Sequence, residues 1–280
     1  MSSLLRFTDW TKVDQIQENF ITYFRIFAGI SGSHFVEKDA AWICTSDGAP
    51  GTQVFKANFP STTVDAYIDA TLAEMGQYTN AIDWMVFPGC RPANLGERLA
   101  ARGRAGGPDG AWRLVGDVPS MAGNWMYMDL NNLSPTPTVS ARFRIVRVNT
   151  ASLLEAWRQI SVAGFESGEC HNFYQAYLRH GFDQDALAHH YIGYVDEQPV
   201  TSGTLLVAGG SASIYNVSTP PAWRRQGYGG AITHAMLQEM RHRGYNWSWI
   251  WASDLGKNVY AQLGFTPTDF GIREYQWRRQ

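Results

Sequence analysis

The sequence has few cysteines and little charge of either sign. Three cysteines occur in 280 residues, Cys44, Cys90 and Cys170, and their spacing matches no metal-binding pattern. An odd and sparse count fits a reduced cytoplasmic protein better than a disulfide scaffold. Charged residues make up 17% and the formal net charge is −2, with no basic run. A positive surface for nucleic acid or for an anionic membrane is therefore not expected.

Long apolar runs are also missing from the sequence. The longest weakly polar stretch, residues 205–217, is interrupted by glycine and serine, so it is not expected to cross a membrane. The first ten residues lack a basic segment followed by an apolar one, so no secretory signal is predicted. Hydrophobic residues still make up 45% of the chain, enough for a sizeable core. These features predict a cytoplasmic protein.

A connector rich in proline and threonine divides the chain into halves of ordinary domain size. Residues 131–138 contain two prolines spaced by one threonine, which favours an extended linker. We predict a first domain over residues 1–133, a linker over 134–141 and a second domain over 142–280.

Helical and strand patterns alternate in both halves and predict a mixed α/β fold. In the first half they predict helices at 9–27, 62–75 and 94–101, and strands at 41–45, 53–58, 83–87, 111–116 and 125–130, the last two closing the first half. In the second half they predict helices at 152–163, 229–243 and 257–263, a less regular helix to 178, and strands at 191–195, 200–207, 212–219, 247–252 and beyond.

The two halves also show a faint internal echo. Residues 84–87 followed by 95–103 parallel residues 249–251 followed by 260–264, each as strand, polar break, short helix and glycine. This order favours a duplicated fold, and chance similarity between two βα units is the alternative.

The most informative motif joins a strand to a helix. A strand ending at Thr219 is followed by two prolines and then by residues 224–229, with the sequence RRQGYG. Glycines let the backbone approach a ligand, and free N–H groups at a helix N-terminus bind an anion such as pyrophosphate. The spacing matches neither GxxxxGK[ST] nor GxGxxG. A plain strand-to-helix turn is the alternative.

Three segments together resemble the GNAT superfamily of acetyltransferases. They are residues 216–219, residues 224–229, which match the family pattern [Q/R]xxGx[G/A], and residues 260–265, which match YxxLGF. The resemblance covers roughly residues 142–280 with the elements in family order. It implies a tandem GNAT-like acyl-CoA N-acyltransferase fold, acetyl-CoA (coenzyme A) as cofactor, and a small-molecule amine as acceptor.

The family fold further implies that the strands at 212–219 and 247–252 splay apart, helped by a bulge, with pantetheine in the gap. The backbone N–H of Val217 would hold the oxyanion. By this resemblance the cofactor-binding residues are Val217, Ser218, Thr219, Arg224, Arg225, Gln226, Gly227, Tyr228, Gly229, Gly230 and Asn258.

The sequence indicates one candidate for the catalytic acid and several for the base. Tyr260 stands where the family places the acid that protonates the departing thiolate, and a core contact is the alternative. No carboxylate occurs in residues 214–218, where many relatives carry a base. Glu166 is our candidate by position, with Glu169 and Asp254 as alternatives. For each of the three, a solvated or structural carboxylate is the favoured interpretation over a base. Water or prior loss of the amine proton would serve as well.

Aromatic residues suggest where an acceptor would lie. Trp247, Trp249 and Trp251 alternate along one strand and share a face, either as core under a helix or as the wall of an acceptor site. The predicted acceptor-binding residues are Phe165, Tyr174, Asn216 and Trp251. The histidines show no metal-ligand geometry, so no metal site is predicted.

The first half lacks the residues that carry cofactor chemistry. Where the second half has its glycine turn, residues 58–65 contain neither GxG nor arginine, and Leu99 falls near the place of Tyr260. We predict a degenerate GNAT-like domain that binds no acyl-CoA. For the second half, an acyl-CoA decarboxylase or hydrolase and a CoA-binding non-catalytic module are alternatives to an N-acetyltransferase. The sequence does not indicate the acceptor or the oligomeric state.

Overall fold

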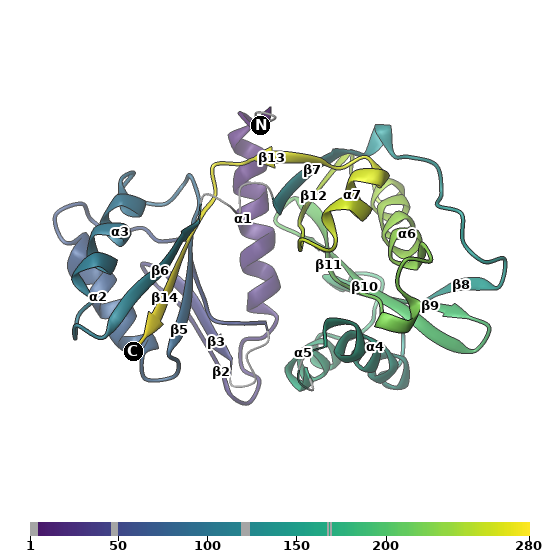
Figure 1. The fold of residues 1–280 in the computed structure, drawn as a ribbon, viewed down its shortest axis with the longest axis horizontal. Coiled ribbons are helices and arrows are strands. Elements are labelled where there is room, and N and C mark those ends of the chain that lie inside the picture. Colours follow the sequence, from purple (N-terminus) through teal and green to yellow (C-terminus); the bar gives the residue numbers. More distant parts are fainter. Residues whose placement is uncertain (1–4, 46–49, 119–123, 167, 169) are drawn as a thin grey trace.

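The computed structural model describes residues 5–45, 50–118, 124–166, 168 and 170–280, and places one long helix between two sheets (Figure 1). This helix is α1 (Trp10–Arg25), close to its predicted range. It begins at Asp9, whose Oδ1 accepts a hydrogen bond from the backbone N–H of Lys12 at 3.2 Å. Among the helices that the structure describes, none combines the length and the apolar character needed to cross a bilayer.

The N-terminal sheet has six strands, and α2 (Val64–Met75) and α3 (Leu95–Ala105) cover its face away from α1 (Figure 1). In spatial order the strands are β2 (Ser33–Glu37), β3 (Ala41–Thr45), β4 (Gln53–Phe55), β5 (Ala81–Val86), β14 (Arg273–Arg279) and β6 (Trp112–Val118). Thr63 precedes α2 as predicted, but its side chain makes no capping hydrogen bond.

The C-terminal sheet has eight strands. In spatial order they are β1 (Leu5–Arg6), β13 (Thr266–Asp269), β7 (Trp125–Asp129), β12 (Trp247–Trp251), β11 (Ser211–Ser218), β10 (Gln198–Ala208), β9 (Ala188–Val195) and β8 (Phe143–Arg147). On the same face as α1 lie α4 (Ala151–Phe165) and α5 (His171–His180), and the opposite face carries α6 (Tyr228–His242) and α7 (Lys257–Leu263). Two short 3₁₀ helices, η2 (Leu130–Asn132) and η3 (Pro221–Trp223), connect these elements.

Strands cross between the halves: β1 and β7 of the first half belong to the C-terminal sheet, and β14 of the second half belongs to the N-terminal sheet. Strand β7 pairs antiparallel with β12 and β13, while β14 lies between β5 and β6 (Figure 1). The expectation that residues 125–130 close the first half is therefore wrong. An apolar strand pattern predicts that a segment joins a sheet but does not predict which strand it pairs with. The division at residues 134–141 describes the order of the segments along the chain, not the composition of the sheets.

The internal echo corresponds to a repeated run of elements. The order β4, α2, β5, α3 in the first half recurs as β11, α6, β12, α7 in the second, and in both runs the two strands pair parallel. The duplicated mixed α/β fold is therefore confirmed.

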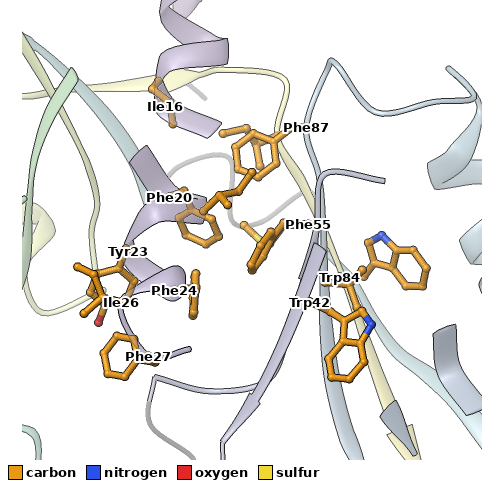
Figure 2. Close-up of a cluster of buried hydrophobic side chains, with 14 of the residues drawn as sticks. Ile16, Phe20, Tyr23, Phe24, Ile26, Phe27, Trp42, Phe55, Trp84 and Phe87 are labelled. Atoms are coloured by element: carbon orange, nitrogen blue, oxygen red, sulfur yellow. The ribbon is translucent and has the colours of Figure 1, made fainter. Parts of the chain in front are cut away.

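Aromatic side chains of α1 join the two sheets. Phe20 and Phe24 project toward Phe55 of β4, with ring centroids 6.0 and 5.3 Å from it (Figure 2). Phe20 also lies 6.0 Å from the ring of Trp251 in the C-terminal sheet. Burial of one phenylalanine contributes roughly 1.5–3 kcal/mol. Several such residues on one helix make the contact between the halves part of the core rather than a surface interface.

Candidate active site

The strands β11 and β12 diverge at one end, as the family resemblance implies. Within the described residues their one register pair is Ser213 with Trp249. Beyond it β11 contains a bulge, because Tyr215 pairs with Thr204 of β10 and the next pair joins Ser218 to Ser202. At the bulge Asn216 has φ 54°. The extra residue turns the end of β11 away from β12 and opens a gap between them.

A cavity of about 810 Å³ lies at this gap. Its wall combines the end of β11, the turn before α6, and one face of α7. The predicted residues that line it are Val217, Ser218, Thr219, Arg224, Arg225, Gly227, Tyr228, Gly229, Gly230, Tyr260 and Phe165. Among the remaining predicted residues, Gln226 and Asn258 do not line this cavity. Its size and its location at a strand–helix junction suit a nucleotide-sized ligand with an extended arm.

The turn before α6 directs backbone N–H groups into this cavity. Arg225 and Gly227 have φ 60° and 84°, and no side chain caps α6. Ala231 is the first residue of this helix to bond back, from its N–H to the carbonyl of Gly227 at 2.9 Å. The N–H groups of residues 228–230 therefore remain for a ligand, at the positive end of the helix dipole. An anion such as a pyrophosphate fits this arrangement.

The two arginines of the turn serve different purposes. Arg224 donates from Nε to the carbonyl of Thr219 at 3.0 Å, and from Nη2 to the carbonyl of Gly164 at 2.7 Å and to Glu166 at 2.9 Å. It thus fastens the end of β11 to the end of α4. Arg225 is exposed and forms no ion pair with any residue that the structure describes. Its guanidinium can therefore meet an anion directly.

Tyr260 lies between this cavity and the core beneath α7. The residue is 7% exposed, lines the cavity, and meets Phe265 edge-on at 6.0 Å. Burial raises the pKa of its hydroxyl above the ordinary value, so the group keeps its proton throughout the neutral range. A neutral phenol at this position can donate a proton or a hydrogen bond.

A family model described as an acetyltransferase (GNAT) domain matches residues 152–268. These residues are a GNAT domain. No curated protein sequence matches the chain significantly.

Solved structures resemble the whole chain at low identity. A GCN5-related N-acetyltransferase from Kribbella flavida is 15% identical, with 94% of this chain and 95% of that one covered, at a TM-score of 0.61. A tandem GNAT protein from the clavulanic acid biosynthesis pathway is 14% identical, with 98% and 96% covered, at a TM-score of 0.60. A conserved protein of unknown function from Staphylococcus epidermidis is 12% identical, with 90% and 96% covered, at a TM-score of 0.55. The chain thus has the tandem GNAT fold.

The predicted base and its alternatives, and the predicted acceptor residue Tyr174, do not gather at one place in the GNAT domain. Glu166 ends α4 at the rim, where its side chain is 62% exposed and paired with Arg224. Asp254 pairs with Lys257 at 2.9 Å, and Glu169 lies outside the described residues. Tyr174 is partly exposed on α5 and stacks near His171. A base at Glu166 stays a prediction.

Trp251 and the other indoles of β12 face α1. Trp247 and Trp249 are 6% and 1% exposed, which confirms the core interpretation for these two. Trp251 stacks on Trp125 at 5.5 Å and its Nε1 has no hydrogen-bond partner within the described residues. Asn216 directs its side-chain amide into the protein, where Tyr23 and Tyr177 bind it. Contact of Trp251 and Asn216 with an acceptor remains a prediction.

The linker contributes to the cavity in a way that the sequence did not indicate. Ser134, Pro135 and Pro137 line it, and Pro137 lies next to Gly230 at the start of α6. The linker is held there because the backbone N–H of Ser134 donates to the carbonyl of Leu263 at 3.3 Å and its carbonyl contacts the His234 ring at 3.0 Å. Two prolines spaced by one threonine predicted only an extended chain, because the residues that hold the linker lie on helices distant in the sequence.

In the N-terminal half, the chain closes the gap that β11 and β12 leave open. The backbone N–H of Arg91 donates to the carbonyl of Ala57 at 2.9 Å, and that of Phe59 donates to the carbonyl of Arg91 at 3.0 Å. These bonds continue the parallel pairing beyond β4 and β5. Leu99 is fully buried near the place that corresponds to Tyr260. That the N-terminal half binds no acyl-CoA stays a prediction.

The two adjacent histidines of β9 have protein partners. His190 is buried and its Nδ1 lies 2.9 Å from the hydroxyl of Thr204. Burial lowers the pKa of His190 to about 3, and burial together with two arginines lowers that of His189 to about 4. Both rings are therefore neutral at neutral pH. In the part of the chain that the structure describes, no three His, Cys, Asp or Glu side chains gather as metal ligands would.

Replacing Arg225 with alanine is expected to weaken coenzyme A binding by about tenfold, since charge-assisted hydrogen bonds to phosphate contribute on the order of 1.5 kcal/mol or more. Isothermal titration calorimetry of the full chain measures this change. Arg241→Ala removes an equally basic residue from the other end of α6 and should retain wild-type affinity. Equal effects of the two substitutions would contradict a direct contact at Arg225.

Proposed function

We propose that the GNAT domain transfers the acetyl group of acetyl-CoA to the amine of a small molecule. One observation carries this proposal: a single cavity joins the free N–H groups before α6, the bulged end of β11, and the hydroxyl-bearing Tyr260. These are the groups needed to hold a pyrophosphate, to bind an oxyanion and to donate a proton. The cofactor supplies an activated thioester, and the protein supplies the surroundings of that bond.

In the proposed reaction the neutral amine attacks the thioester carbonyl directly. Its lone pair forms the new C–N bond, and the backbone N–H of Val217 stabilises the negative charge on the oxygen. The C–S bond then breaks with its electron pair going to sulfur, and Tyr260 donates a proton to the thiolate. The proton that the amine loses passes to Glu166 or to solvent. The product is an amide together with free coenzyme A.

Arg224 supports this arrangement without needing to touch the ligand. It ties the carbonyl of Thr219, at the end of β11, to the carbonyl of Gly164 in the last turn of α4. The approach is close, because a Cβ on Gly164 would lie 1.9 Å from the hydroxyl oxygen of Ser218. A glycine at residue 164 therefore lets α4 hold the end of β11 in the position that opens the gap.

We expect the full chain to bind one coenzyme A, since the gap is open in the C-terminal half and paired shut in the N-terminal half. Calorimetry measures the stoichiometry, and two molecules per chain would contradict it. Thiol release from acetyl-CoA across a panel of amines then tests the reaction. Rates that depend on the amine support transfer, whereas equal thiol release with and without amine would indicate a hydrolase. Binding without thiol release would indicate a non-catalytic module.

A further inference from the structure

The bulge of β11 puts a side-chain-bearing residue into a backbone conformation that has to be held. Asn216 has φ 54°, in the left-handed region, which costs most residues about 1–2 kcal/mol and asparagine less. Such a conformation persists where the surroundings specify it. The bulge also sets the direction of the next backbone N–H group, that of Val217. The contacts of Asn216 therefore decide how firmly this N–H is aimed.

Both ends of the Asn216 amide are bound by tyrosines from two helices. The hydroxyl of Tyr23 on α1 donates to Oδ1 at 3.1 Å, and Nδ2 donates to the hydroxyl of Tyr177 on α5 at 3.1 Å. The Tyr177 hydroxyl also interacts with that of Tyr23. Tyr23, Tyr177 and Asn216 form what we call the bulge cluster. Tyr23 and Tyr177 are 6% and 1% exposed, so water does not replace these bonds readily.

Tyr23 comes from the N-terminal half, and its own position is fixed by several contacts. It lies on the side of α1 away from Phe55 (Figure 2) and stacks on Tyr215, with ring centroids 4.2 Å apart and planes at 9°. The hydroxyl of Tyr215 donates to Oδ1 of Asn19 at 3.0 Å. Nδ2 of Asn19 in turn donates to the carbonyls of Ala208 and Ser211, both at 3.1 Å. These contacts fix the position of α1 relative to β11.

The far end of α1 is fastened as well. Arg179 and His180, at the end of α5, contact the carbonyl of Ile26 at 3.2 and 3.1 Å, just beyond the last turn of α1. These contacts satisfy a carbonyl that the helix itself leaves free. The two helices that supply tyrosines to the bulge cluster are thus joined to each other, and the cluster closes over the bulge from both.

We propose that Tyr23 is a positioning residue for the acetyl transfer: through Asn216 it holds the bulge of β11 and thereby aims the N–H of Val217 at the reacting carbonyl. The consequence for catalysis rests on the proposed function, whereas the hold on the bulge does not. The N-terminal half then has a part in the chemistry of the other half, through a hydroxyl group that does not line the cavity.

Tyr23→Phe removes this hydroxyl and keeps the ring that stacks on Tyr215. Tyr215→Phe is a matched control, because it removes another buried hydroxyl that links the same helix to the same strand but does not reach Asn216. If Tyr23 acted by docking α1 alone, both substitutions would have the same effects. Both variants are made in the full chain.

The first measurement is hydrogen exchange of residues 214–219 in the ligand-free protein. We expect exchange to be at least about tenfold faster in Tyr23→Phe than in wild type and unchanged in Tyr215→Phe. The second measurement separates binding from turnover. We expect kcat for acetyl transfer to fall at least about tenfold in Tyr23→Phe, with the Kd for coenzyme A within twofold of wild type, because a small displacement of a donor costs that much.

Equal exchange rates and equal kcat in the two variants would overturn the proposal. If Tyr23→Phe does not fold, Asn216→Gly replaces it, because glycine accepts a φ of 54° without strain and makes neither hydrogen bond. Fast exchange in that variant supports the proposal and wild-type exchange overturns it. Should the wild type transfer no acetyl group to any amine, the proposed function fails, while the exchange measurement still decides the role of Tyr23.

Discussion

Tyr260→Phe is expected to lower kcat about a hundredfold while acetyl-CoA binds as tightly as before, since loss of general acid catalysis typically costs that factor or more. The phenylalanine ring keeps the contact with Phe265 and the wall of the cavity. What disappears is the proton for the departing thiolate. Because burial raises the pKa of this hydroxyl, wild-type activity should show no loss from Tyr260 ionisation as the pH rises through neutrality.

Steady-state kinetics with the best amine, together with calorimetry for the Kd, measure both parts of this expectation. Tyr245→Phe provides a control, because Tyr245 packs against the same core cluster without lining the cavity. A Tyr260→Phe enzyme with wild-type kcat would remove the acid from the proposed mechanism. A matching loss of kcat and of affinity would assign Tyr260 to the shape of the cavity instead.

A second large effect is expected far from the cavity, where Glu274 is buried in β14. The residue is 3% exposed, and its Oε2 has no hydrogen-bond partner within the described residues. Burial, with a smaller contribution from Asp83, raises the pKa of Glu274 from 4.5 to about 7. Between these values the folded chain binds a proton that the unfolded chain has lost. Stability is therefore full below pH 4.5 and decreases as the pH rises to about 7.

From this group alone, the free energy of unfolding should fall by up to about 3 kcal/mol between pH 5 and pH 8. Glu274→Gln keeps the shape without the charge, so it should raise the urea midpoint at pH 8 and flatten its pH dependence. Glu197→Gln removes the same charge from a side chain that is 89% exposed in the β9–β10 turn and should keep the wild-type profile. A Glu274→Gln profile parallel to wild type would show that the carboxyl is not buried in solution.

The sequence predicted best what adjacent residues determine. The bounds of α7 were those expected. Both α6 and β11 begin and end one residue earlier than expected. Glycines 227 and 229 marked the turn because a close backbone approach requires them at that place. The bulge and the splayed strands came through the family resemblance, and the register of Tyr215 and Ser218 confirms them.

What the sequence could not predict depends on partners distant in the chain. The alternation of arginine, tyrosine and tryptophan in β14 does not show whether the strand pairs with β5 or extends the other sheet, since either sheet offers an apolar face. The same holds for Asn216, whose amide meets a tyrosine 193 residues away. Its place in the strand before the glycine turn suggested a ligand contact, and nothing nearby in the sequence pointed to α1.

The exchange of β7 and β14 sets an order on the synthesis of the protein. The N-terminal sheet lacks an inner strand until residues 273–279 have left the ribosome, and the C-terminal sheet takes its own inner strand from residues 125–129. The N-terminal half therefore cannot complete its sheet before the strands of the C-terminal half have been made. Until then β5 and β6 lack the strand that lies between them, and late long-range pairing of this kind leaves strand edges exposed. Folding of the first half is thereby tied to a segment that is made after every other strand of the molecule.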